Sequence, residues 1–88
     1  MKIKEDFLLR EVAGSNIVVP LGDAEMNFGG MMTLNEVGTF IWRALEQETT
    51  EEAVVKALLS EYAIDEATAK KDVHTYIARL RDKGVIED

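Results

Sequence analysis

The stretch that decides the fold is residues 34–45, Leu34-Asn35-Glu36-Val37-Gly38-Thr39-Phe40-Ile41-Trp42-Arg43-Ala44-Leu45. A short polar break leads directly into a helical pattern. Apolar residues recur at i, i+3, i+4, i+7 and i+8, at Val37, Phe40, Ile41, Ala44 and Leu45. This spacing predicts an amphipathic helix with one buried face. Asn35 is a good N-cap, and Thr33 with Glu36 offers a competing capping box, so two helix starts remain open.

Upstream of this helix, the sequence predicts strands and turns. Phe7–Val12 and residues 17–21 are rich in strand formers, and the turn signal Ala13-Gly14-Ser15-Asn16 between them predicts a β-hairpin. Pro20 cannot donate to a ladder, so we expect it at an edge, a bulge or a strand end. A third strand is expected within residues 26–34, most reliably at residues 30–33.

Downstream, two more helices are predicted. Thr49-Thr50-Glu51-Glu52 forms a capping box for the second helix, and Asp65 caps the third. The apolar stripe of the second helix is Val55, Leu58, Leu59 and Tyr62, and that of the third is Ala69, Val73, Tyr76, Ile77 and Leu80. Gly84 ends the third helix, and Val85-Ile86 returns to the core.

Strands followed by helices with short connections predict an α+β fold: a winged-helix-like, three-stranded antiparallel sheet followed by three α-helices, in a single domain over residues 1–88. Gly38, inside the first helix, costs about 1 kcal/mol relative to alanine; a close approach by a neighbouring strand would explain its presence. The third strand would end the sheet with an open edge, and one natural cover for such an edge is a strand donated by a peptide.

Composition excludes several classes of function. The chain has 88 residues, 47% of them hydrophobic, and no cysteine, so we expect no disulfide and no Cys-based zinc site. His74 is the single histidine, and Gly29-Gly30 lacks the lysine and following Ser/Thr of a phosphate-binding loop. We therefore predict no enzyme, no catalytic, cofactor-binding or metal-binding residues, and no cofactor. No signal peptide or membrane-spanning run is visible, which favours a cytoplasmic protein without membrane contact.

The net charge is −7, yet five of the ten basic residues fall within residues 66–83. Two interpretations remain open for this basic segment. It can be an ordinary solvated helix face, or a local site for an acidic partner.

The order of these pieces resembles the pyrroloquinoline quinone biosynthesis protein D (PqqD-like) family. The resemblance runs from about residue 7 to residue 86. It is carried by Gly14 at the hairpin turn, Leu34-Asn35 leading to Gly38 and Ile41-Trp42, Thr50-Glu51-Glu52, residues 58–62, Asp72-Val73, Tyr76-Ile77, Leu80, and Gly84-Val85-Ile86. No single piece is specific; their order and spacing are.

The resemblance implies a non-catalytic recognition element for ribosomally made, modified peptides. Such a domain binds the leader segment of a precursor peptide as an extra antiparallel strand on the third strand, packed against the third helix. It presents the core peptide to a modifying enzyme, often a radical S-adenosylmethionine (radical SAM) protein carrying iron–sulfur clusters. The Arg-Leu-Gln-Trp-like run associated with quinone-pathway members is missing here, which favours the wider peptide-binding family over a role in making that quinone.

Carried onto this sequence, the predicted peptide-binding residues form two groups. The ladder partner is the backbone of Gly30, Met31, Met32, Thr33 and Leu34, with the inward-pointing methionine as an adaptable apolar contact. On the third helix, the stripe Lys70, His74, Ile77 and Arg81 is expected to line the groove, with Lys70, Lys71 and Arg81 attracting acidic leader residues, while Val73, Tyr76 and Leu80 are expected in the core.

Two other functions fit the same fold. A DNA-binding winged helix would place the third helix in the major groove, although the charge of −7 argues against phosphate binding and we expect no nucleic-acid partner. A small structural domain could instead form a homodimer by pairing its open strand with a second copy.

Overall fold

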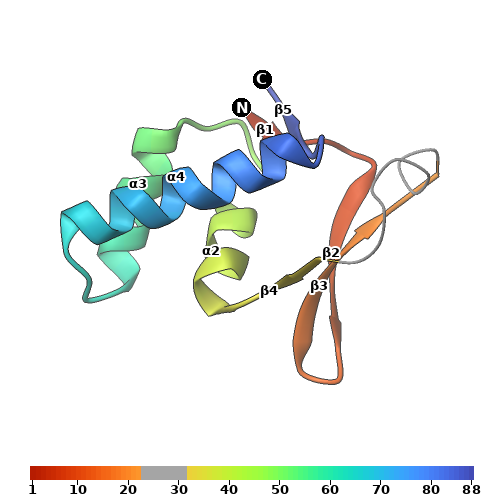
Figure 1. Cartoon of the computed structure of the whole chain (residues 1–88), viewed down its shortest axis with the longest axis horizontal. Helices are drawn as coiled ribbons and strands as arrows, with labels where there is room; N and C mark the ends of the chain where they lie inside the picture. Colours follow the sequence, from red (N-terminus) through yellow and green to blue (C-terminus); the bar gives the residue numbers. More distant parts are fainter. Residues whose placement is uncertain (23–31) are drawn as a thin grey trace.

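The computed structural model describes residues 1–22 and 32–88 and shows a small sheet beside a layer of helices (Figure 1). The elements are β1 (Lys2–Ile3), β2 (Phe7–Val12), β3 (Ser15–Pro20), β4 (Met32–Leu34), α2 (Glu36–Ala44), α3 (Glu51–Glu61), α4 (Glu66–Asp82) and β5 (Ile86–Glu87). Strands β2, β3 and β4 form an antiparallel sheet in that order, and three helices follow it in the chain. The predicted α+β, winged-helix-like class is therefore confirmed.

The β2–β3 hairpin closes through a two-residue turn, shorter than the four-residue turn segment that the sequence suggested. Val12 pairs with Ser15, and the intervening Ala13 and Gly14 have φ values of +52° and +82°. Two successive positive φ values are typical of a type I′ turn, whose twist matches that of the strands. Strand β3 consequently starts at Ser15 and ends at Pro20, where a missing N–H does least harm to the ladder.

We expect Ala13→Asn to stabilise the protein. A non-glycine residue at positive φ is strained, and asparagine tolerates that conformation better than alanine. The gain should be about 0.5–1 kcal/mol, or roughly 2–8 °C in the melting temperature measured by circular dichroism. Gly14→Ala is the matched counterpart: a Cβ there meets no atom within 4 Å, so backbone strain alone should lower the melting temperature. A lower melting temperature for Ala13→Asn would contradict this account of the turn.

Strand β4 overlaps the strand predicted at residues 30–33 and ends one residue later. It spans Met32–Leu34 and pairs with β3 in the register Asn16↔Leu34, Ile17↔Thr33 and Val18↔Met32. Met32 and Leu34 are buried, and Thr33 is exposed, as expected for alternating residues of a sheet with one covered face. The predicted positions Gly30 and Met31 lie outside the described residues.

Side-chain caps fix the start of each helix. Asn35 Oδ1 accepts from the Gly38 N–H at 2.8 Å, so Asn35 and not the Thr33–Glu36 box caps α2. Thr50 and Asp65 cap α3 and α4 by accepting from the N–H groups three residues on. The hydrogen bonds from Thr68 lower the pKa of Asp65, because they favour the charged carboxylate.

A second, two-stranded ribbon joins the ends of the chain, and sequence analysis did not predict it. β1 pairs with β5 in the register Lys2↔Glu87 and Ile3↔Ile86. The Ile3 N–H donates to the Leu45 carbonyl at 2.8 Å, and the Lys4 N–H donates to the Val85 carbonyl at 2.9 Å. The ribbon therefore ties the end of α2 to the segment after α4.

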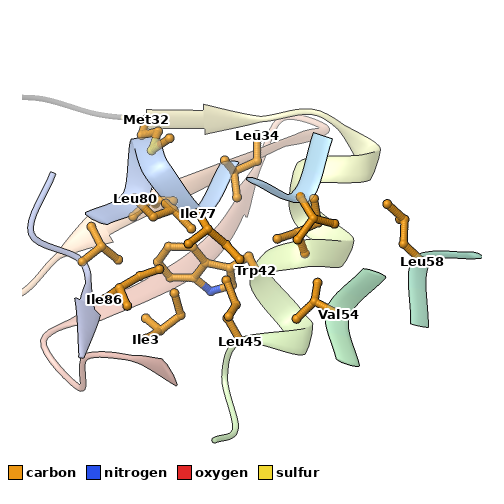
Figure 2. Packing of buried hydrophobic residues seen from close by; sticks show 14 of the residues in the cluster. Ile3, Met32, Leu34, Trp42, Leu45, Val54, Leu58, Ile77, Leu80 and Ile86 are labelled. Atoms are coloured by element: carbon orange, nitrogen blue, oxygen red, sulfur yellow. The ribbon is translucent and has the colours of Figure 1, made fainter. Parts of the chain in front are cut away.

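The hydrophobic core lies between the sheet, the ribbon and the helices. Figure 2 shows Trp42 at its centre, surrounded by Ile3, Leu45, Ile77 and Ile86. Val85 and Ile86 are buried, as the sequence predicted for the segment after Gly84. Among the described residues, no helix combines the length and the apolar character needed to cross a membrane.

Candidate functional site

Strand β4 has a partner on one side only in the described part of the chain. The strand order β2-β3-β4 places it at the end of the sheet, paired with β3. An edge strand offers backbone N–H and C=O groups to any further strand that arrives. Because the side chains of Met32 and Leu34 point into the core, these groups and Thr33 are what this strand can offer a ligand.

Tyr76 links α4 to the junction between β4 and α2. Its hydroxyl donates to Asn35 Oδ1 at 2.6 Å, so Asn35 accepts both this bond and the helix-capping bond from Gly38. An added Cβ on Gly38 would lie 2.6 Å from Tyr76 Cε1 and 2.8 Å from its hydroxyl oxygen. The close approach that requires glycine therefore comes from a tyrosine of α4, and the expected approach by a strand is wrong.

Arg79 lies next to Tyr76, one turn further along α4. Its guanidinium carbon is 5.8 Å from the centre of the Tyr76 ring, within the range of a cation–π contact. We call Met32–Leu34 of β4, together with Asn35, Tyr76 and Arg79, the β4–α4 surface. Sequence analysis missed the role of Tyr76 and Arg79 here, although Gly38 inside a helix was a signal that a bulky side chain lies against it.

Three polar side chains predicted to line the groove on α4 have partners on α3, on α4 itself and at Asp88. His74 Nδ1 lies 3.3 Å from Glu51 Oε2 at the start of α3, and Lys70 pairs with Glu66 at 3.2 Å beside a hollow lined by α3. Arg81 pairs with Asp88 at 2.8 Å and reaches the Met1 sulfur, beside the β1–β5 ribbon. The Asp88 carboxylate raises the pKa of Arg81 in return. Lys71 is exposed.

The sequence predicted Tyr76 in the core and Ile77 in the groove, and the structure shows the reverse order of burial. Ile77 is 1% exposed and belongs to the core, whereas Tyr76 is half-buried at its border. The buried face of α4 is Ala69, Val73, Ile77 and Leu80. Helix α3 packs against α4, and Tyr76 lies beside Gly38 of α2 and Asn35, the residue that follows β4. A groove-lining role for the Ile77 side chain does not fit this packing.

A hollow that adjoins the β4–α4 surface lies between the hairpin turn, the end of β4 and α2. Its lining includes Asn16, Thr33, Glu36, Thr39 and Tyr62. Burial and the neighbouring Glu36 carboxylate raise the pKa of Tyr62, because both disfavour the phenolate. Within residues 1–22 and 32–88, no group of three or more His, Cys, Asp or Glu side chains could hold a metal ion.

Comparisons with known proteins agree with this geometry. The sequence matches the family described as Coenzyme PQQ synthesis protein D (PqqD) over residues 15–86. No curated protein sequence matches it. The solved structure of TbiB1 in complex with the TbiA(beta) leader peptide is similar, with a TM-score of 0.78 and 26% identity, covering 99% of this chain and 95% of that one. A lasso peptide synthetase B1 complexed with the leader peptide has a TM-score of 0.76 and 17% identity, with coverage of 99% and 96%.

Proposed function

This chain belongs to the PqqD family, and on that premise we propose that it binds the leader segment of a ribosomally made precursor peptide as an added strand on β4. The observation that carries the proposal is the position of β4 at the end of the sheet, with α4 held beside it through Tyr76. The likeness to TbiB1, whose structure contains a leader peptide, supports it.

The hydrogen bonds of an added strand do not by themselves supply enough free energy for tight binding of a leader. Each ladder hydrogen bond contributes roughly 0.5–1.5 kcal/mol net, so four to six residues of strand alone bind weakly. Side chains of the leader must therefore make further contacts, and α4 is the element placed to receive them. We keep Gly30, Met31, Met32, Thr33 and Leu34 in the proposed site and assign the α4 contribution to the face that carries Tyr76 and Arg79.

We further propose that the protein acts without catalysis, in the cytoplasm, as one domain over residues 1–88. Its task would be to hold the leader while a modifying enzyme, which we propose to be a radical SAM protein, acts on the rest of the precursor. Membership of the family supports this division of labour. Pairing of β4 with a second copy would compete with the leader for the same edge.

An amide-resolved NMR titration tests the proposal. The probes are the TbiA(beta) leader peptide and synthetic leaders of short peptides encoded beside the gene for this chain. We expect at least one probe to bind and to shift the amides of Met32–Leu34 and of the α4 turn around Tyr76. Failure of every probe to bind, or shifts confined to other surfaces, would refute the proposal. Light scattering on the same samples should show a monomer with bound peptide; a persistent dimer would favour self-pairing of β4.

A further inference from the structure

From the β4–α4 surface we infer that Arg79 selects leader peptides that carry an acidic residue at one fixed register position. The inference rests on the proposed function, because it requires the leader to lie along β4. The substrate class it names is an acidic leader, read by a single guanidinium and not by the basic segment as a whole.

Arg79 is connected to the end of β4 through Tyr76 and Asn35. Asn35 directly follows β4, and its side-chain oxygen is 2.6 Å from the Tyr76 hydroxyl. The Tyr76 ring is held against Gly38, and Arg79 lies over that ring at 5.8 Å. The Tyr76 side chain therefore connects Asn35, the residue after β4, to the Arg79 guanidinium. We infer that a strand added at β4 passes within reach of that charge.

The Arg79 guanidinium is available for a carboxylate of the peptide. Two other basic side chains of α4 already have carboxylate partners: Lys70 has Glu66, and Arg81 has Asp88. Within residues 1–22 and 32–88, Arg79 makes no ion pair, and its contact is the Tyr76 ring. A planar guanidinium resting on an aromatic ring keeps its N–H donors available for a carboxylate.

The charge around Arg79 limits where an acidic residue of the peptide is favoured. The chain carries −7 overall, which disfavours acidic peptides at long range. Asp72 lies on the same side of α4 seven residues earlier, about 10 Å along the helix axis. An acidic side chain of the peptide is therefore favoured close to Arg79 and disfavoured close to Asp72, which ties the preference to the register of the peptide.

A displayed library of random peptides, selected on the intact protein, tests this inference. Peptides that protect the amides of Met32–Leu34 from hydrogen exchange are kept as β4 binders. Among them, we expect Asp or Glu to be enriched at one position, with Glu→Gln there weakening binding roughly 2- to 5-fold, as for an exposed ion pair. Arg79→Gln should abolish the preference, and Arg79→Glu should reverse it to Lys or Arg at the same position.

Two further variants make the test specific. Arg10→Glu makes the same charge change on β2, at the opposite edge of the sheet, and should leave the preference intact. Arg81→Glu tests the stripe predicted from sequence. If β4 binders show no acidic preference, or if Arg81→Glu and not Arg79→Glu reverses it, the inference is overturned while the proposed function stands. If no selected peptide protects β4, the proposed function itself fails.

Discussion

Truncating Ile77 to alanine is expected to destabilise the protein by about 2–5 kcal/mol, because it removes a fully buried side chain from a close-packed core. A chain of this size has a total stability of roughly 4–13 kcal/mol, so the loss is a large part of it. The melting temperature should fall by roughly 10–30 °C, as measured by circular dichroism. A residue that merely lined a peptide groove would show no such effect.

Ile64→Ala is the matched control for this variant. Ile64 has the same side chain but lies half-buried at the edge of the core, before α4 begins. Truncation of Ile64 should lower the free energy of unfolding clearly less than truncation of Ile77. If Ile77→Ala loses less stability than Ile64→Ala and also binds the peptide more weakly, Ile77 lines the groove as sequence analysis predicted.

Gly38→Ala is expected to destabilise the protein by about 1–3 kcal/mol, despite the higher helix propensity of alanine. Propensity alone would favour alanine by about 1 kcal/mol. The new Cβ would meet the Tyr76 ring at 2.6 Å, and a hydrogen bond to Asn35 holds that ring in place. Overpacking of this kind forces the ring to move and breaks the bond. Urea denaturation measures the change in the free energy of unfolding.

The sign of the Gly38→Ala effect should depend on Tyr76. In a Tyr76→Ala background the obstructing ring is gone, so Gly38→Ala should stabilise by up to about 1 kcal/mol. Tyr76→Phe separates the two contributions, because it keeps the ring and removes only the hydroxyl bond, worth about 0.5–1.5 kcal/mol. A stabilising Gly38→Ala in the otherwise unchanged protein would show that the contact between α2 and α4 is looser than described.

Sequence analysis found the features that depend on residues close together in the chain: a strand, helix caps and a hairpin. Strand β2 was predicted with its observed bounds. Asp65 was recognised as a cap and Asn35 as one of two candidates, because a capping side chain acts on residues only three positions away. The cap of α3 is Thr50, one residue after the first threonine of the predicted capping box. The hairpin was also found, although its turn is shorter. Gly14 indicated a residue at positive φ, whereas alanine at position 13 gives no such indication although Ala13 also has a positive φ.

The β1–β5 ribbon and the orientation of α4 depend on contacts between residues far apart in the chain. The β1–β5 ribbon joins two-residue strands from opposite ends of the chain, too short to show any periodicity. On α4, apolar spacing allowed either Tyr76 or Ile77 to face the core, and the choice depends on how α2 and α3 cover the helix. The predicted basic stripe followed helix geometry, and its polar side chains have partners on α3, on α4 itself and at Asp88. Its part in peptide binding stays a prediction, since no sequence pattern states where β4 lies.

Binding by a peptide with single N-methylated amides tests the added strand most directly. In a strand, alternate residues direct their N–H groups to the same neighbour. Each peptide of the series carries one N-methylated amide. Methylation of an N–H that faces β4 should weaken binding by roughly 2- to 12-fold, the equivalent of one ladder bond. These positions should alternate with positions at which methylation has little effect. Equal sensitivity at neighbouring positions, or none at all, would contradict the claim that the leader extends the sheet at β4.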